Sequence, residues 1–317
     1  MITTGTATFG VDLGGTNLRV GVVDADATVV GQRRMPTPAT LDEIVAAIAG
    51  HVAELRHDRP DAVGLGVGAA GMVDRAGTIH YSPNVRAFTH APVQERLLDV
   101  LAMPVAVDND ANVAALGELT HGAAHGYDDV LLVTLGTGVG GGVVVNGTVL
   151  RGAHGFGAEI GHFQVDPDGP LCACGERGHW EAVASGTALG ALGRARAATG
   201  AAPGLLARAD GDVDAIRGTT VGAAAQAGEA DALAVLHEYA QQVGVGLVGL
   251  VNVLDPALVV VAGGLVDLGD VLLDPIRESF AGRIEGAKYR PDVPIVAAAL
   301  GVDAGLVGAA VLARSAR

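Results

Sequence analysis

Aromatic residues are scarce in this chain of 317 residues, at 3% of the sequence, although half of all residues are hydrophobic. The core must therefore be built from alanine, valine, leucine and isoleucine. The length is sufficient for two domains with a sizeable core. Glycine is abundant, at 48 residues. This composition is typical of an α/β protein in which the backbone approaches ligands closely at tight turns.

Positive charge is also in short supply. Lysine and arginine total 20 residues against 35 aspartates and glutamates, so the net charge is −15. A surface of this sign disfavours nucleic acids and anionic membranes as partners. We therefore expect a bound nucleotide to be held by backbone amides, helix ends and Mg2+ rather than by a basic surface.

Long hydrophobic runs are missing as well. The most apolar run, Val243–Leu254, is too short to cross a membrane and ends at Asp255 and Pro256. The first twelve residues lack the basic and apolar regions of a signal peptide. The chain has two cysteines in C-x-C spacing, which suits a disulfide poorly. These features predict a reduced, cytoplasmic protein.

Both cysteines lie in the segment 159–181, with the sequence EIGHFQVDPDGPLCACGERGHWE. Cys172, Cys174 and His179 follow the pattern C-x-C-x4-H, and His162 lies ten residues upstream of Cys172. Thiolate and imidazole are the ligands that zinc prefers in a closed tetrahedral site. The alternative is two buried free cysteines and two surface histidines. The clustering favours a structural zinc site.

Two glycine-rich turns follow the same plan. The first joins the expected strand Thr8–Gly14 to the expected strand Leu18–Asp24 through V-D-L-G-G-T-N. The second, G-T-G-V-G-G-G, joins Asp129–Leu135 to Val143–Val145. Such turns can cradle a phosphate, and the acid in the first can hold Mg2+ through water. The alternatives are a plain hairpin for the first turn and a flexible linker for the second. Two copies indicate a duplicated architecture.

A third motif lies where a strand is expected to meet a helix. The strand Pro104–Asp108 is followed by N-D-A-N and by a helix over about 111–120. Asn109 and Asp110 would then lie at the carboxyl edge of a sheet, where open α/β sheets bind ligands. The alternative is that Asp110 is a helix N-cap, which is common for aspartate. An earlier strand, Ala62–Gly68, ends near Gly71.

The pattern elsewhere predicts helices and one further strand. Thr40–His57 opens with a capping box and has helical spacing of its apolar residues. Glu229–Leu254 is apolar on nearly all sides near its end, so we expect it to be buried. Three glycines in that helix indicate close packing: Gly244, Gly246 and Gly249. Further expected elements are the helix 182–198, the strand Leu258–Ala262 before Gly263 and Gly264, the helix Asp270–Phe280, the strand Ile295–Ala299 and the helix Asp303–Ala313.

E-x-G-H followed by C-x-C-G-x-x-G-x-W-E resembles the ROK sugar kinases, most closely their bacterial glucokinases. The resemblance extends from Val11 to about Val311. It implies an α/β protein with the duplicated actin-like ATPase (ribonuclease H-like) fold, in two domains with a cleft between them. The domains expected are residues 1–114 and 115–302, with the helix 303–317 packing back on the first domain and the zinc motif in the second.

The resemblance implies phosphorylation of glucose at its 6-hydroxyl by ATP with Mg2+, with Asp110 as the catalytic base. The zinc ligands would be His162, Cys172, Cys174 and His179. The sugar ligands would be Gly71, Asn84, Asn109, Asp110, Glu159, His162 and Glu181. The nucleotide and its metal would lie against Asp12, Gly14, Gly15, Thr16, Asn17, Gly136, Thr137, Gly138, Gly263 and Gly264.

Two positions depart from the family pattern. His179 stands where the family has its last cysteine ligand. Three thiolates and one imidazole give a site with a net charge of −1, whereas two of each give a neutral site, so we expect weaker metal retention. Asn17 stands where many members have lysine, which alters the expected phosphate contacts.

The sequence leaves several alternatives. The sugar could be N-acetylmannosamine, N-acetylglucosamine or fructose, and G-x-W-E favours glucose. A sugar-responsive repressor of the same family is disfavoured. Such repressors carry a helix-turn-helix domain before the first phosphate turn, whereas ten residues precede Val11 here, and the negative net charge is wrong for DNA. A non-catalytic sugar-binding protein is disfavoured by the complete set of motifs. Some relatives use polyphosphate as the donor, and relatives form dimers or tetramers, so we expect a homo-oligomer.

Overall fold

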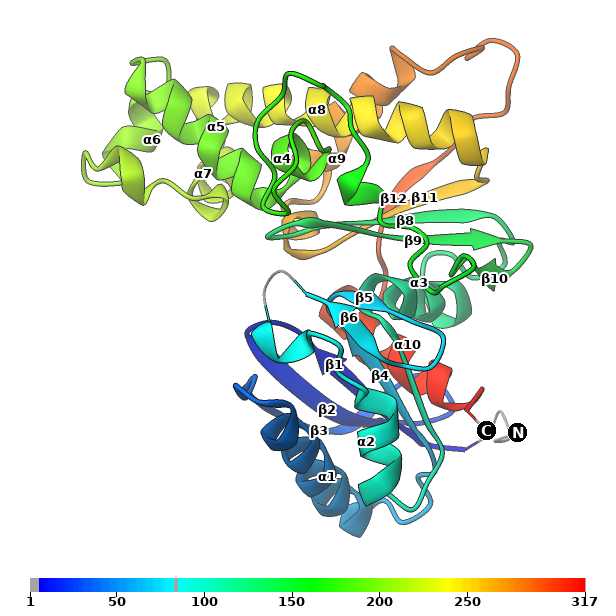
Figure 1. Cartoon of the computed structure of the whole chain (residues 1–317). Helices are drawn as coiled ribbons and strands as arrows, with labels where there is room; N and C mark the ends of the chain where they lie inside the picture. The colour runs from blue at the N-terminus through cyan, green and yellow to red at the C-terminus, as the bar shows by residue number, and fades with distance from the viewer. Residues whose placement is uncertain (1–5, 83–84, 317) are drawn as a thin grey trace. The chain divides into compact units, whose positions relative to one another are not determined.

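The computed structural model describes residues 6–82 and 85–316 (Figure 1). The chain divides into two compact units. The first contains Met1–Asp128, Gly142–Ala158 and Ala298–Arg317, and the second contains Asp129–Gly141 and Glu159–Ala297. The domain limits expected at residues 114 and 302 stay a prediction, because compact units need not be independently folding domains.

The first unit contains a five-stranded sheet in the order β3-β2-β1-β4-β7. Its strands are β1 (Thr8–Leu13), β2 (Asn17–Val23), β3 (Val29–Pro36), β4 (Leu65–Ala69) and β7 (Val105–Asn109). The first three strands pair antiparallel, and β4 pairs parallel with both β1 and β7. A short hairpin, β5 (Met72–Val73) and β6 (Ile79–Tyr81), follows β4.

The second sheet has the order β10-β9-β8-β11-β12. Its strands are β8 (Val130–Leu135), β9 (Val139–Val145), β10 (Thr148–Val149), β11 (Leu258–Ala262) and β12 (Ile295–Ala297). Here β9 lies between β8 and β10 and pairs antiparallel with β10. The strand β8 pairs parallel with β11, which follows it much later in the chain and pairs parallel with β12. The two sheets therefore have the same plan, and the predicted duplicated α/β architecture is confirmed.

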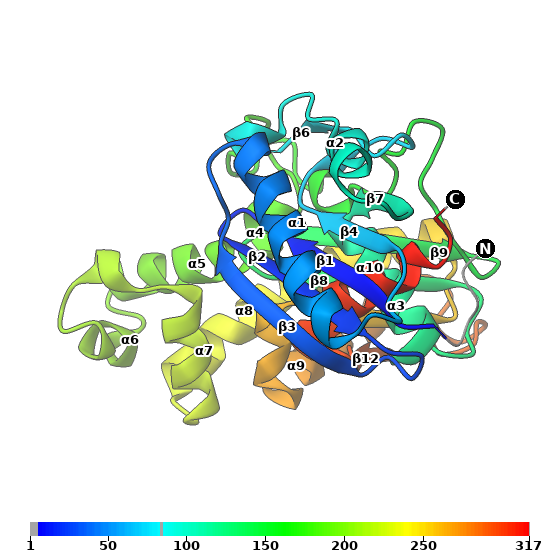
Figure 2. The ribbon, with the colours of Figure 1, turned by 90° about the horizontal axis from the view of Figure 1, so that it is seen from below.

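Helices cover both faces of the first sheet. They are α1 (Leu41–Asp58), α2 (Val93–Val100), α3 (Asp110–His121) and α10 (Ala304–Ala313). Alternate residues of β1 point to opposite faces, as the pleat requires. Phe9 and Val11 belong to the core shared with α1, whereas Thr8 donates through Oγ1 to the carbonyl of Ala310 in α10 at 2.7 Å. Figure 2 shows α1 in front of this sheet and α10 behind it.

Glycine in the strands permits the close approach of α10. A Cβ atom on Gly66 in β4 would lie 1.8 Å from the carbonyl oxygen of Ala309, and one on Gly10 in β1 would lie 2.1 Å from that of Leu306. Both distances are far shorter than a van der Waals contact. The helix therefore lies directly on the backbone of β1 and β4, and any side chain at these two positions would displace it.

The second unit carries the remaining helices. They are α4 (Glu181–Ala184), α5 (Gly186–Ala198), α6 (Pro203–Arg208), α7 (Gly218–Gln226), α8 (Ala230–Leu254) and α9 (Asp270–Ala281). The single helix expected over 182–198 is wrong, because the chain breaks at Ser185, whose Oγ accepts from the N–H of Ala188 at 3.1 Å and caps α5. None of the helices in the described part of the chain combines the length and hydropathy that a membrane span requires.

Several local predictions are confirmed. Thr40 caps α1, and the capping box with Glu43 is complete. Two of the three glycines expected to permit close packing of α8 do so, because Gly244 faces Ser279 and Gly246 faces Trp180. Gly249 is exposed, and a Cβ there would meet Phe163 at an ordinary 3.8 Å.

We expect Gly246→Ala to destabilise the protein by about 1–3 kcal/mol, as overpacking does in a tight core. The added Cβ would lie 2.1 Å from Cε2 of Trp180, a fully buried ring whose Nε1 donates to the carbonyl of Gln242 at 3.0 Å. Urea unfolding would measure the loss. Gly249→Ala is the matched control on the same helix and should be neutral or stabilising by up to about 1 kcal/mol. Equal stability of the two variants would contradict this packing.

Candidate active site

A cavity of about 680 Å3 opens in the second unit. It lies among the turn after β8, the start of α5, the start of α7 and the 3-10 helix Gly264–Leu268. Helix N-termini and exposed turn amides carry partial positive charge, so this wall suits an anionic ligand such as a nucleotide phosphate. The lining residues are Gly136, Thr137, Gly186, Thr187, Gly190, Arg194, Asp214, Arg217, Gly218, Thr219, Gly264 and Leu265.

The turn after β8 is tied to the start of α5. The N–H of Gly186 donates to the carbonyl of Gly136 at 2.7 Å, and Oγ1 of Thr187 donates to the carbonyl of Thr137 at 2.7 Å. Gly263 has a φ of 87° and lies against the end of β8, where a Cβ would be 2.5 Å from the carbonyl oxygen of Leu135. The cavity is thus lined by Gly136, Thr137 and Gly264 from the predicted nucleotide set, with Gly138 and Gly263 next to them in the chain.

Nine of the twelve lining residues were missed by the sequence reasoning, and five of the nine are polar: Thr187, Arg194, Asp214, Arg217 and Thr219. Arg194 donates through Nη1 to the carbonyl of Ile216 at 2.8 Å, and Arg217 donates to the carbonyls of Ile216 and Asp214. Two guanidinium groups therefore add positive charge to a wall that we expected to consist of amides and helix ends. The available signal was the pair of S-G-T and G-T-T sequences, which start α5 and α7.

The glycine turn of the first unit joins β1 to β2. The N–H of Gly14 donates to the carbonyl of Asn17 at 3.0 Å, and Thr37 donates through Oγ1 to the carbonyl of Gly14 at 2.7 Å. Gly15 and Thr16 are exposed at its tip. The turn is therefore rigid at its base and accessible where a phosphate would bind.

Asp12 lies near the end of β1, beside the guanidinium of Arg19. Burial raises the pKa of Asp12, and the guanidinium of Arg19, 3.9 Å away, acts in the opposite direction. Arg19 is itself held by Asp303 and by the carbonyl of Val302. A partly desolvated carboxylate at a turn of exposed amides is suited to hold Mg2+ through water.

Asn109, not Asp110, is the N-cap of α3. Its Oδ1 accepts from the N–H groups of Ala111 at 2.9 Å and Asn112 at 3.1 Å, and its Nδ2 donates to the carbonyl of Gly71 at 3.0 Å. Among the residues that the structure describes, Nδ2 has this one acceptor, so its other N–H can donate to a ligand. Because Asn109 caps the helix, the alternative role of Asp110 as its cap is wrong. Asp110 is the first residue of the helix and is half-buried.

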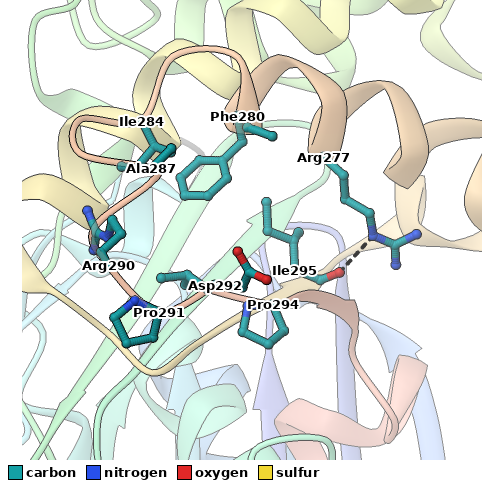
Figure 3. A pocket seen from close by; sticks show the side chains of 11 residues that line it. Arg277, Phe280, Ile284, Ala287, Arg290, Pro291, Asp292, Pro294 and Ile295 are labelled. Carbon is teal, nitrogen blue, oxygen red and sulfur yellow. Dashed lines mark hydrogen bonds between the residues drawn. The ribbon is translucent and has the colours of Figure 1, made fainter.

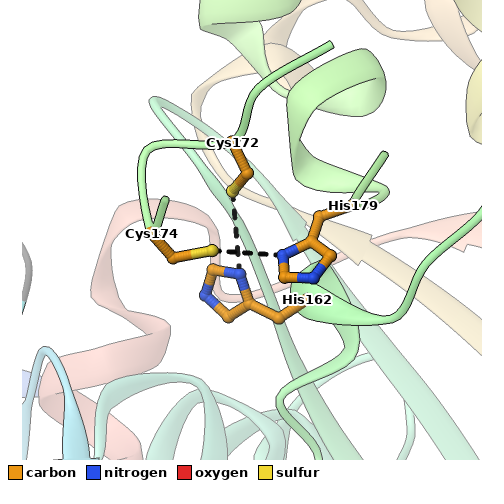
Figure 4. A group of neighbouring side chains, drawn as sticks. All are labelled: His162, Cys172, Cys174 and His179. Carbon is orange, nitrogen blue, oxygen red and sulfur yellow. Dashed lines mark hydrogen bonds between the residues drawn. The ribbon is translucent and has the colours of Figure 1, made fainter. Parts of the chain in front are cut away.

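The four predicted metal ligands come together in the second unit (Figure 4). Their ligand atoms all lie within 4.8 Å of one another. Sγ of Cys172 is 3.8 Å from Nδ1 of His162, and Sγ of Cys174 is 3.2 Å from Nδ1 of His179. Edges of a zinc tetrahedron with sulfur and nitrogen ligands are about 3.3–3.8 Å. The donor set and its spacing therefore fit a closed zinc site.

Two carboxylates adjoin this cluster. Glu181 accepts through Oε2 from the N–H of Val139 at 3.0 Å and through Oε1 from the thiol of Cys172 at 3.4 Å. Burial raises the pKa of Glu159, and the proximity of Glu181 raises it further while His162 lowers it. Burial also raises the pKa of the Cys172 thiol to about 11. The predicted sugar ligands Glu159, His162 and Glu181 are thus neighbours, whereas Asn84 lies outside the described residues.

Comparison with known proteins gives a consistent result. The sequence pattern of the ROK family matches residues 8–316. A glucokinase of Streptomyces coelicolor is 43% identical over 97% of each chain. The crystal structure of a ROK family glucokinase from Streptomyces griseus with glucose and AMPPNP has a TM-score of 0.87 at 43% identity, covering 98% of this chain and 99% of that one. An N-acetylmannosamine kinase of Citrobacter koseri is 35% identical over 97% of this chain and 99% of its own.

This chain belongs to the ROK family. The predicted family membership and the predicted fold are therefore confirmed. Its departures from the family pattern can now be compared with the geometry. At Asn17, the side-chain oxygen accepts from Nε of the exposed Arg34 at 3.2 Å, so a cation stands beside the position where many family members have lysine. At His179, Nδ1 of the ring lies 3.2 Å from Sγ of Cys174, within the cluster of two cysteines and two histidines.

A second cavity, of about 360 Å3, lies between α9 and the segment that leads into β12 (Figure 3). Phe280, Ile284 and Pro294 give it apolar walls, and Arg277 at its edge donates through Nε to the carbonyl of Ile295 at 3.0 Å. None of the residues predicted for the active site lines it. This cavity is therefore separate from the residues that the sequence predicts for the active site.

Proposed function

We propose that this protein transfers the γ-phosphoryl group of ATP to the 6-hydroxyl of glucose. The observation that carries the proposal is the near-complete match, at a TM-score of 0.87, to a ROK glucokinase whose crystal structure holds glucose and AMPPNP. That relative binds a sugar and a nucleotide, and the motifs found in this chain are suited to the same two ligands. The products are glucose 6-phosphate and ADP.

Asp110 is the proposed base. As the 6-oxygen attacks the γ-phosphorus, its proton passes to the carboxylate of Asp110 and the bond from phosphorus to the β,γ-bridging oxygen breaks. Asn109, held by Gly71 and by the start of α3, presents its remaining amide N–H to the sugar. Glu159, His162 and Glu181 are the proposed ligands of the other hydroxyls. Asn84 keeps this role as a prediction from the sequence.

The cavity in the second unit is the proposed adenine-nucleotide site. The amides at Gly136–Gly138 and the N-termini of α5 and α7 support binding of the phosphates, and Arg194 and Arg217 add positive charge. Asp12, Gly14, Gly15, Thr16 and Asn17 are the proposed residues around the phosphates and Mg2+ in the first unit. Bound Mg2+ would neutralise charge on the transferred phosphoryl group.

His162, Cys172, Cys174 and His179 are the proposed ligands of a structural zinc ion. In that role the ion would hold the loop before Glu181. Cys172 would bind it as the thiolate, so the thiol proton that Oε1 of Glu181 accepts would be lost on binding. Both imidazoles face the sulfurs with Nδ1, so Nε2 of His162 remains for a sugar hydroxyl. Free thiols used as metal ligands agree with the expected reducing, cytoplasmic location.

We expect His179→Cys to retain zinc more strongly than the wild-type protein does. A third thiolate adds a negative charge to the site, and Zn2+ binds thiolate well. The measurement is the rate of zinc loss to a chromogenic chelator at neutral pH. The mock-treated wild type and His154→Cys, a change outside the cluster, are the controls. Faster loss from His179→Cys than from the wild type would contradict the assigned ligand.

N-acetylmannosamine is the second candidate substrate, because a kinase for that sugar is also similar over nearly its whole length. The test is ADP release by zinc-replete protein with MgATP and a panel of glucose, mannose, fructose, N-acetylglucosamine and N-acetylmannosamine. Preferred turnover of glucose supports the proposal. Preferred turnover of an N-acetyl sugar would make that sugar the substrate in place of glucose. Replacing ATP with polyphosphate in the same assay identifies the phosphoryl donor. A dimer or tetramer stays a prediction for the same preparation.

A further inference from the structure

Asp108 is a buried carboxylate to which the proposed mechanism assigns no role. Its side chain is 6% exposed, and it directly precedes Asn109 and Asp110 at the end of β7. Oδ1 accepts from the N–H of Asn109 at 2.8 Å and from Nδ2 of Asn112 at 3.0 Å, while Oδ2 accepts from Nε of Arg151 at 2.6 Å. The carboxylate therefore links the strand end, the first turn of α3 and one cation.

Arg151 belongs to the segment between β10 and Glu159, and this segment is held by one internal hydrogen bond and by two contacts with the hairpin β5–β6. The carbonyl of Arg151 accepts from the N–H of Gly157 at 3.0 Å, and the carbonyl of Gly152 accepts from Nη2 of Arg75 at 2.6 Å. Gly155 lies against β5, where a Cβ would be 2.5 Å from the carbonyl oxygen of Val73. The guanidinium of Arg151 thus approaches Asp108 from a fixed backbone.

We propose that Arg151 is a positioning residue for the phosphoryl transfer, acting through its ion pair with Asp108 on the strand end that carries Asn109 and Asp110. The inference rests on the proposed function, in which Asp110 is the base. A carboxylate as buried as that of Asp108 is stable in place only when it is paired. Without Arg151 it would turn toward water and release its hold on the main chain of Asn109 and on Asn112.

The kinetic test compares Arg151→Gln, Arg151→Lys and the control Arg75→Gln in the full-length protein. A base displaced by about 1 Å costs on the order of 100-fold in rate, so we expect that loss in kcat for Arg151→Gln. The KM for MgATP should stay at the wild-type value, because neither arginine lines the nucleotide cavity. Arg151→Lys keeps the charge and should recover part of kcat. Arg75 holds the same segment without touching Asp108, so Arg75→Gln should retain the wild-type kcat.

Hydrogen–deuterium exchange of the peptide 105–113 supplies a readout that does not depend on activity. Exchange should be faster in Arg151→Gln than in the wild type and unchanged in Arg75→Gln. Unchanged exchange, or a wild-type kcat in Arg151→Gln, overturns the inference. Equal loss of kcat in the two glutamine variants also overturns it, because the segment rather than the ion pair would then matter.

The two proposals fail in different ways. A wild-type protein that releases no ADP with any hexose overturns the proposed function, and the exchange comparison then still decides whether Arg151 holds the strand end. Loss of turnover in Asp110→Asn together with full turnover in Arg151→Gln overturns the inference about Arg151 alone.

Discussion

Asp110→Asn is expected to lower kcat for glucose phosphorylation by about 10²–10⁴-fold, the range that a positioned general base contributes. Asparagine has nearly the same shape and retains an oxygen that can accept from the N–H of Ala111, as Oδ1 of Asp110 does at 2.9 Å. It cannot take the proton of the attacking hydroxyl. Glucose binding should therefore remain largely in place, because the other sugar ligands are unchanged. Steady-state ADP release and calorimetric titration with glucose measure the two effects separately.

Asp42→Asn is the matched control for this variant. Asp42 also lies in the first turn of a helix, α1, where its exposed carboxylate pairs with Arg96 at 2.6 Å. Loss of that charge should change helix stability by about 0.3–1 kcal/mol and leave kcat unchanged. Near-normal turnover by Asp110→Asn would exclude Asp110 as the base. Loss of glucose binding in the same variant would instead make Asp110 chiefly a sugar ligand.

Cys172→Ala is expected to lower zinc affinity by at least about 10–100-fold and to raise the KM for glucose. Cys172 is 3% exposed, and its loss leaves three ligands around a metal that prefers four. The same thiol contacts Glu181, a proposed sugar ligand at the start of α4. The loop and the carboxylate should therefore lose their positions together, and Tm should fall by several degrees.

Metal analysis of the purified variant and the glucose dependence of its ADP release test this expectation. The control is wild-type protein stripped with a chelator. The stripped protein should show the same raised KM for glucose. Added zinc should return that KM to its original value in the wild type but not in Cys172→Ala. A variant that still holds one zinc ion per chain would show that Cys172 is not a ligand. A normal KM in the metal-free wild type would separate zinc from sugar binding.

The features predicted correctly from the sequence depend on local constraints. The capping box at Thr40, the strands on either side of the two glycine turns and the ends of α8 are each set by a few neighbouring residues. Repetition of the strand-turn-strand plan indicated the duplicated architecture before the pairing of any strand was known. The metal cluster was also recognisable, because three of its four ligands lie within eight residues of one another.

Other features were missed because their local signals are weak. Helix α2 and the hairpin β5–β6 were not predicted, and α6 lies in a stretch that carries little periodicity. The break at Ser185 depends on one side-chain cap inside an otherwise continuous helical pattern. That Asn109 rather than Asp110 caps α3 is a difference of one residue, which no propensity resolves, since both residue types are good caps.

Residue types and their spacing in the chain were thus sufficient for the family, the duplicated sheets and the grouping of the four Cys and His side chains, whereas the role of Asp110 as the base stays a prediction. Those signals come from residues close together in the chain, so they can be interpreted without knowledge of the packing. Tertiary structure was needed to bring Arg151 onto Asp108, 43 residues away, and to place Arg194 and Arg217 at the larger cavity of the second unit. An arginine on the surface and one that neutralises a buried carboxylate look alike in sequence, because burial and partner depend on contacts between distant segments.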